Sequence, residues 1–410
     1  MAKILILIGA HLSTAPRPQK EAETLAKAGH EVIVRGVWFD PELVERDRIL
    51  MQKKEWKFKP IIDFQPHNRW QNFRVRLQVK IAREKYQRFQ IFTPALLGYG
   101  AKAMLKVARQ TRADLTIVHS EVGLWVGNQL LNEGFQVGVD FEDWFSEDLL
   151  PEARLTRPIE QLKQYEARLA KECQYCLATS HAMAKAIAKA YNAPKPTVIY
   201  NTFPWAEREY IDGKIKDRKN LELLSLHWFS QTIGIGRGLE TLFSALDYLQ
   251  TPVEIHLRGN YSESSRQLLE PLIPSRWRKH IFIHPTVPQD ELLSRIAEHD
   301  IGLALEQTNV NSRNFTVTNK LFQYLQGGLA IIATDTIGQQ EVLSKCFVIG
   351  ELVSSNNPAN LALALKKLIE NTQYLSEVKA AVLEVAKNEL CWEEQESILL
   401  TGLKKALNKL

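Results

Sequence analysis

Short apolar runs alternate with longer stretches of helical period through the first half of the chain. The runs lie at residues 4–8, 32–34, 115–118, 137–139, 175–178 and 198–200. Between them, apolar residues recur every three or four positions, as they do in amphipathic helices. Strands that alternate with helices predict a parallel sheet covered by helices.

The same pattern restarts after a polar, charged interval at residues 206–220. The second set of runs lies at 223–226, 253–257, 281–283, 301–305, 330–333 and 347–349. Two helical patterns, 357–388 and 392–407, follow without a strand between them. The last helix could cap the second set of strands or cross back onto the first.

We therefore predict an α/β protein with two Rossmann-like, doubly wound domains that face a cleft. A chain of 410 residues exceeds the size at which one core stops growing. The expected parts are an N-terminal Rossmann-like domain at 1–205, a C-terminal Rossmann-like domain at 206–390 and a C-terminal helix at 391–410. Ligands of such sheets bind beyond the carboxyl ends of the strands.

Composition narrows the class of protein. Hydrophobic residues make up 45% and charged residues 24% of the chain, as in an ordinary globular protein. No apolar run approaches the ~20 residues that span a bilayer, so we expect a soluble, cytoplasmic protein. The four cysteines, Cys173, Cys176, Cys346 and Cys391, are too few for a disulfide framework. Cys173 and Cys176 form a Cys-x-x-Cys pair and are expected to be buried structural thiols; a redox pair or half of a zinc site is the alternative. No motif indicates a metal site or a nucleic-acid reader.

A glycine-bearing loop follows the strand expected near residue 225 and precedes a helix that begins at Leu239. Gly234, Gly236 and Gly238 would let backbone amides approach an anion, and Arg237 could bind phosphate oxygens in a fork. The spacing lacks the gap of a dinucleotide fingerprint, so nicotinamide chemistry is not expected. The loop predicts a phosphate site; the alternative is a flexible connector with a surface arginine.

A second polar group lies farther along the chain. A strand delivers Glu306 to its carboxyl end, and a helix is expected to begin near Thr318, whose hydroxyl would cap it. Asn319 and Lys320 fall in the first turn. Because a lysine there opposes the helix dipole, Lys320 is better explained by a bound phosphate than by the structure alone.

Residues 320–335, Lys-Leu-Phe-Gln-Tyr-Leu-Gln-Gly-Gly-Leu-Ala-Ile-Ile-Ala-Thr-Asp, resemble a known family. They are similar to the donor-site helix and following strand of retaining glycosyltransferases of family four, which have the GT-B fold. The segments Thr-Val-Ile-Tyr-Asn at 197–201 and Cys-Trp-Glu at 391–393 resemble the same family. The resemblance covers nearly the whole chain.

This resemblance implies a donor site for a UDP- or GDP-linked sugar, a substrate rather than a tightly bound cofactor. Arg237 and Lys320 would bind the diphosphate, and Gln323 would stand where the family usually has a glutamate facing the ribose. The other family glutamate falls at Phe315, and Glu306 could substitute for it. The implied donor residues are Gly234, Gly236, Arg237, Glu306, Thr318, Asn319, Lys320 and Gln323.

The acceptor side is expected in the N-terminal half. Glu142 and Asp143 follow a strand where the family often has a His-Asp pair beside the reacting sugar. They are catalytic candidates that could orient an acceptor hydroxyl, or simply acidic residues favoured at a helix start. His11, Arg17 and His119 follow the strand ends and are candidate acceptor contacts, although a lone histidine is more often structural.

Residues 67–90 predict a basic amphipathic helix. Residues 51–110 hold fourteen Lys and Arg against Glu55, Asp63 and Glu84. Apolar and basic side chains side by side indicate peripheral contact with an anionic membrane, here its inner face. A solvated helix or a phosphate-rich acceptor would fit the same pattern.

Together these features predict an enzyme that moves a sugar from a nucleotide-sugar to a saccharide or lipid-linked acceptor. Retention of configuration, no metal requirement and a role in surface polysaccharide biosynthesis are expected, with Arg237 and Lys320 stabilising the departing diphosphate. The missing family glutamates and histidine leave a catalytically silent sugar- or nucleotide-binding protein as one alternative. A nucleotide-sugar epimerase on the same fold is another.

Overall fold

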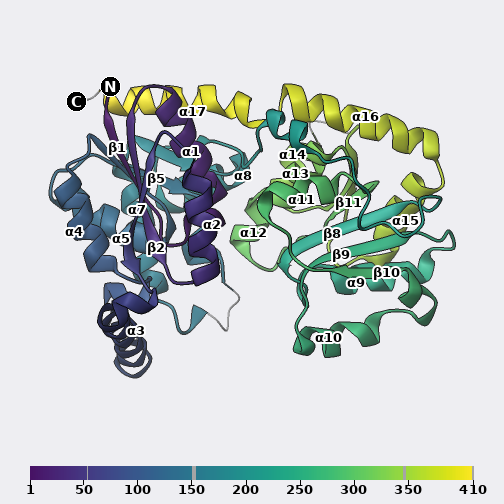
Figure 1. Ribbon diagram of the computed structural model, residues 1–410, viewed down its shortest axis with the longest axis horizontal. Helices are drawn as coiled ribbons and strands as arrows, with labels where there is room; N and C mark the ends of the chain where they lie inside the picture. Colours follow the sequence, from purple (N-terminus) through teal and green to yellow (C-terminus); the bar gives the residue numbers. More distant parts are fainter. Residues whose placement is uncertain (53, 150–153, 345–347, 409–410) are drawn as a thin grey trace. The chain divides into compact units, whose positions relative to one another are not determined.

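The computed structural model describes residues 1–52, 54–149, 154–344 and 348–408, which form two compact units (Figure 1). Unit 1 comprises Met1–Ile199 and Glu396–Leu410, and unit 2 comprises Tyr200–Gln395. The polar interval at 206–220 belongs to unit 2. Cys346 and the first residue of the predicted run 347–349 lie outside the described residues.

The sheet of unit 1 has seven parallel strands in the order β3-β2-β1-β4-β5-β6-β7. Ile4 of the central strand β1 pairs with Val32 on one side and Leu115 on the other, and residues 4–7 are fully buried. The edge strand β3 was not predicted, because lysines interrupt its apolar residues. The strands are β1 Lys3–Leu7, β2 Glu31–Trp38, β3 Lys57–Asp63, β4 Leu115–Val118, β5 Val137–Phe141, β6 Tyr175–Ala178 and β7 Thr197–Val198.

Helices pack against this sheet, and side-chain caps fix where two of them, α2 and α8, begin. Asp40 accepts hydrogen bonds from the amides of Glu42 and Leu43 at the start of α2, and Ser180 caps α8. The last helix, α17 (Trp392–Leu407), belongs to unit 1 from Glu396 onward. The other helices are α1 Pro16–Lys27, α2 Pro41–Met51, α3 Arg69–Phe89, α4 Ala101–Thr111, α5 Ser120–Asn132, α7 Ile159–Glu172 and α8 His181–Tyr191.

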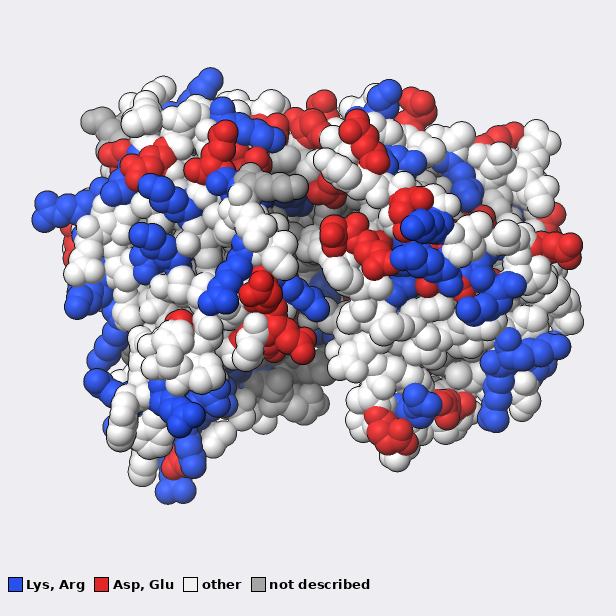
Figure 2. Space-filling view, viewed as in Figure 1, with Lys and Arg blue, Asp and Glu red and all other residues white. Residues whose placement is uncertain are grey.

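Helix α3 exposes an apolar stripe between basic side chains. Its inner face buries Val75, Val79, Ala82 and Tyr86. Lys and Arg side chains gather over α3 at the lower left of Figure 2. Among the described residues, no helix is long and apolar enough to cross a membrane. The stripe consists of Trp70, Phe73, Leu77 and Ile81, and the exposed basic residues are Arg69, Arg74, Arg76, Lys80, Arg83, Lys85 and Arg88.

The sheet of unit 2 has six parallel strands in the order β10-β9-β8-β11-β12-β13. The single helix expected over 357–388 is two helices, because Asn371 caps a new one by accepting from the amide of Tyr374. The strands are β8 Ser225–Thr232, β9 Glu254–Asn260, β10 Ile281–His284, β11 Ile301–Ala304, β12 Ala330–Thr334 and β13 Gly350–Val353. The helices are α9 Leu239–Ala245, α10 Glu263–Leu269, α11 Gln289–Ile296, α12 Asn311–Phe315, α13 Asn319–Gly327, α14 Ile337–Leu343, α15 Pro358–Ile369 and α16 Thr372–Asn388.

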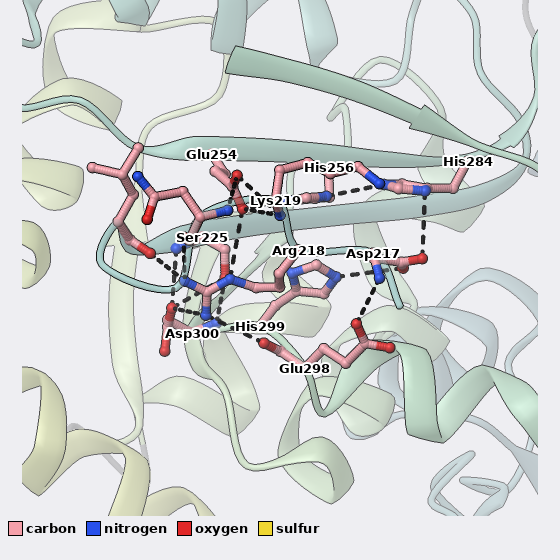
Figure 3. Close-up of polar contacts among 12 residues, drawn as sticks. Asp217, Arg218, Lys219, Ser225, Glu254, His256, His284, Glu298, His299 and Asp300 are labelled. Carbon is pink, nitrogen blue, oxygen red and sulfur yellow. Dashed lines mark hydrogen bonds and ion pairs between the residues drawn. The ribbon is translucent and has the colours of Figure 1, made fainter. Parts of the chain in front are cut away.

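Four histidines pack together beside this sheet, His227, His256, His284 and His299, which we call the histidine cluster; Figure 3 shows the last three. The rings of His227 and His299 stack with centroids 4.6 Å apart, and Nδ1 of His256 lies 2.9 Å from Nε2 of His284. Asp217, from the polar interval, lies 3.4 Å from Nδ1 of His284 and pairs with Arg258. These contacts fix the polar interval to unit 2.

Candidate active site

Several of the predicted site residues follow the strands at which each sheet reverses its order. In unit 1 the reversal lies between β1 and β4, and in unit 2 between β8 and β11. Open parallel sheets bind ligands beyond the carboxyl ends of the strands at such points. His11 and Arg17 follow β1, and His119 follows β4. The glycine loop follows β8, and Glu306 follows β11.

The glycine loop of unit 2 packs directly against the end of β11. Gly238 has a φ of 81°, and a Cβ there would collide with the backbone carbonyl of Leu305, so the position requires glycine. The amide of Gly236 donates to Oε1 of Glu240 at 2.5 Å. Nη1 of Arg237 donates to Oγ of Ser230 at 3.2 Å. The loop thus brings Arg237 toward the strand end that carries Glu306.

Glu306 binds two of the residues predicted for the donor site. Its Oε1 accepts from Nζ of Lys320 at 2.5 Å and from Oγ1 of Thr318 at 3.2 Å. Burial alone would raise the pKa of Glu306, but Lys320, Thr318 and the charge of Arg237 outweigh it and lower the pKa below its usual range. Glu306 is therefore a carboxylate surrounded by the two cationic side chains.

These contacts correct two details of the prediction. Thr318 occupies the N-cap position of α13, but its hydroxyl binds Glu306 instead of capping the backbone. Lys320 finds its counter-charge in Glu306, so its place at the helix start does not by itself require a phosphate. A diphosphate that binds Lys320 must compete with Glu306. Asn319 is exposed beside this group, and Gln323 is nearly buried in the next turn.

In unit 1, a buried ionic network lies behind the predicted acceptor residues. Nε of Arg17 donates to Oδ2 of Asp140 at 2.6 Å, and its Nη1 donates to the carbonyl of Ile199 at 2.7 Å. Nε2 of His119 lies 2.9 Å from Oε2 of Glu21, whose Oε1 accepts from the hydroxyl of Tyr175 at 2.6 Å. Arg17 and His119 are thus almost fully buried parts of the network.

The spacing of Glu21, His119 and Asp140 would also suit a metal ion, because one possible ligand atom from each lies within 4.8 Å of the others. The carboxylates among these possible ligands already have cationic partners. Asp140 pairs with Arg17 and Glu21 with His119, so a cation would have to displace both partners. An internally balanced ionic network fits these residues better.

His11 is buried in a different set of contacts. Its Nδ1 lies 3.3 Å from Oδ2 of Asp47, and its Nε2 accepts from the amides of Phe39 and Asp40 at 2.8 and 3.0 Å. Both ring nitrogens are therefore engaged within the chain. Contact of His11 with an acceptor would require this arrangement to open.

Glu142 and Asp143 come directly after β5 and are both partly exposed. The side chain of Glu142 is 27% exposed, and its Oε2 lies 3.6 Å from Nδ1 of His119. A three-residue 3-10 turn, Phe145–Glu147, follows them instead of an α-helix. A long helix dipole is thus not the reason for the acidic pair.

Comparison with known protein families gives a match over most of unit 1. Residues 20–204 match the model of Glycosyltransferase Family 4. The chain carries a glycosyltransferase domain. No curated protein matches the sequence closely enough to add a relative.

Solved structures similar to the glycosyltransferase extend the fold to both units. Anabaena Alr3699/HepE in complex with UDP and glucose has 16% identity and a TM-score of 0.70, covering all of both chains. Sucrose-phosphate synthase from Thermosynechococcus elongatus has 14% identity and a TM-score of 0.68, again over all of both chains. A mutant of S. aureus TarM in complex with Fondaparinux, alpha-GlcNAc-glycerol and UDP has 9% identity and a TM-score of 0.67 with the same coverage. The predicted GT-B fold with two Rossmann-like domains is confirmed.

Several partners of the predicted residues had not been foreseen. Glu21, Asp140 and Tyr175 complete the network in unit 1, and the ring of Trp228 lies 5.7 Å from Nζ of Lys320 in unit 2. Glu21 did leave a signal in the sequence, because it adjoins Ala22 and Leu25 on the apolar face of α1. Nothing in the local pattern connects it with His119.

Proposed function

We propose that this glycosyltransferase transfers a sugar from a UDP- or GDP-linked donor to a saccharide or lipid-linked acceptor. The arrangement of Arg237 and Lys320 around Glu306 at the β8/β11 reversal carries the proposal. Two cationic side chains beside a glycine loop can bind a diphosphate and stabilise the charge that develops as it leaves. The donor complex of Anabaena Alr3699/HepE with UDP-glucose supports a nucleotide-sugar donor.

In the proposed reaction, the bond between the anomeric carbon and the diphosphate breaks, and the acceptor oxygen takes its place with retention. Arg237 and Lys320 hold the leaving diphosphate, each supplying about 3 kcal/mol to the transition state. Glu142, with Asp143 beside it, orients the acceptor hydroxyl, whose proton passes to the oxygen of the departing diphosphate as the new bond forms. The residues named here need no metal ion for these steps.

We further propose that the acceptor lies at a membrane. The stripe of α3 leaves Trp70 83% and Phe73 60% exposed, and seven basic residues flank it. Apolar side chains between cations suit the headgroup region of an anionic bilayer, at about 1 kcal/mol for each basic residue near the surface. The enzyme would then act in surface polysaccharide biosynthesis at the inner face of the membrane.

The test of the donor site is the thermal stability of the purified protein with UDP, GDP, ADP, CMP and their sugars. A ligand at 100 times its Kd stabilises by about 2.7 kcal/mol. We expect one nucleotide to raise the Tm, Arg237→Met and Lys320→Met to abolish the rise, and Lys387→Met, an exposed lysine of α16, to keep it. No response to any nucleotide would contradict the donor site.

The two alternative functions, a silent binding protein and an epimerase, predict different products when the purified protein is given nucleotide-sugars. A silent binding protein would show the nucleotide shift and release no nucleoside diphosphate in the presence of oligosaccharides or a lipid extract. An epimerase would form a new nucleotide-sugar without any acceptor.

A further inference from the structure

A chain of polar contacts runs from the interior of unit 1 to Glu142. The hydroxyl of Tyr175 donates to Glu21 at 2.6 Å, Glu21 lies 2.9 Å from Nε2 of His119, and Nδ1 of His119 lies 3.6 Å from Glu142. The four residues come from β6, α1, the end of β4 and the end of β5. Tyr175, Glu21 and His119 are each 1% exposed, whereas Glu142 reaches solvent.

The charges around His119 favour its protonated form. Burial by itself would lower the pKa of His119, but Glu142, Glu21 and Asp140 outweigh it and raise the pKa to about 10. Arg17 is the other charged side chain of this network, and it pairs with Asp140. An imidazolium has an N–H on each ring nitrogen, so one can face Glu21 and the other Glu142.

If His119 had only a structural role, the N–H at its Nδ1 would have no explanation. Nδ1 of His119 is buried and has no hydrogen-bond partner among the residues that the structure describes. A buried donor without a partner costs about 1–3 kcal/mol. The nearest acidic group is the carboxylate of Glu142, at ion-pair distance and open to solvent. The contact of Nδ1 with Glu142 therefore points to a role of His119 in holding that carboxylate.

We propose that His119, held by Glu21 and Tyr175, is a positioning residue that fixes the carboxylate of Glu142 for the acceptor. The proposal rests on the acceptor role proposed for Glu142. A side chain held by an ionic partner loses fewer rotamers when it binds the acceptor, which favours a productive geometry. His119 itself touches neither sugar in this scheme.

The contact can be tested without a substrate, by 15N NMR of histidine-labelled full-length protein. We expect both ring nitrogens of His119 to be protonated at pH 8, with the signals assigned by their loss in His119→Gln. Glu142→Gln should lower the pH at which His119 loses its proton. A neutral ring at pH 8, or a titration that Glu142→Gln leaves unchanged, would overturn the proposal.

Two substitutions separate the two contacts of His119. In His119→Asn, the side-chain amide nitrogen takes the position of Nδ1, which faces Glu142. In His119→Gln, the side-chain amide nitrogen takes the position of Nε2, which contacts Glu21. We expect His119→Gln to lower kcat at least tenfold with an unchanged KM for the sugar nucleotide, and His119→Asn to retain most of the activity. In a Glu142→Gln background, His119→Gln should cause no further loss.

If the loss of kcat in the double variant equals the product of the losses in the two single variants, His119 acts independently of Glu142. Tyr175→Phe, which removes only one hydroxyl, provides a milder second variant if His119→Gln does not fold. A wild type that transfers no sugar while the NMR coupling is intact would overturn the proposed function. An active wild type without the coupling would overturn the role of His119 alone.

Discussion

Acid should weaken unit 2 through its histidine cluster. Burial, with the neighbouring His299 and His284 second, lowers the pKa of His256 to about 2, and burial lowers the pKa of His284 to about 4 although Asp217 opposes the shift. The pKa values of His227 and His299 are lowered as well, mainly by burial. His256 and His284 are therefore neutral at pH 5 in the folded protein, whereas unfolded histidines are mostly protonated there.

The sign and size of the effect follow from proton linkage. When the pKa of a histidine is lower in the folded protein than its unfolded value of about 6.5, the free energy of unfolding falls as the pH drops from about 6.5 toward the folded pKa. Between pH 7 and pH 5 the loss is about 2 kcal/mol for each histidine that stays neutral when folded. That is a large share of the stability of a typical domain.

The assay is urea unfolding of the full chain at pH 7, 6 and 5, comparing wild type with His284→Asn. The variant must be compared with the wild type at each pH, because unit 1 contains groups whose protonation stabilises the folded state. One is Glu166, whose pKa burial raises to about 7, so that its contribution to stability grows as the pH falls from 7. We expect the variant to lose less stability than the wild type between pH 7 and pH 5, by about 2 kcal/mol.

Phe282→Leu provides a control without a titrating group. Its ring stacks on His256 with centroids 5.1 Å apart, so the variant should be less stable at every pH, with the pH dependence of the wild type. Parallel curves for wild type and His284→Asn would show that the imidazole is protonated in the folded state and would refute the reasoning.

The remaining predictions concern the donor loop and α3. Glu306→Gln should tighten UDP binding about fivefold in calorimetry, because it removes the anion that competes for Lys320, and weaker binding would contradict that competition. Gly238→Ala should destabilise the fold by about 2 kcal/mol in urea unfolding, since it adds a collision with Leu305 to a positive φ. Gly236→Ala, with open space around its Cβ position, should cost only about 1 kcal/mol, and equal losses would argue against the collision. Phe73→Glu should reduce co-sedimentation with vesicles of phosphatidylcholine and phosphatidylserine at least tenfold, whereas Lys387→Glu in unit 2 should not; equal binding by both variants would contradict the membrane role of α3.

Local sequence patterns were sufficient to predict the glycine loop and the helix that follows it. A glycine loop after a strand, with Arg237 in it, is visible as a pattern of neighbouring residues, and α9 begins at Leu239 as expected. The partner of Lys320 was not visible in this way. Glu306 precedes Lys320 by 14 positions, and only the packing of β11 against α13 brings the two side chains within 2.5 Å.

The network around Arg17 and His119 depended more strongly on tertiary structure. Tyr175 and Glu21 are 154 positions apart and His119 and Glu21 are 98 apart, so no helical or strand period connects them. The same is true of Asp217, which reaches His284 only because the polar interval folds onto the sheet of unit 2. Contacts of this kind depend on which strands become neighbours.

The sequence by itself determined most of the elements and the class of fold, because strand and helix periods and turn residues act over a few positions. It also determined which residues follow the strand ends and can therefore reach a ligand. Only the tertiary structure decided that His11 is engaged in the interior, that Glu306 neutralises Lys320 and that His119 faces Glu142. Strand order and burial set these charges and contacts, and both are properties of the whole folded unit.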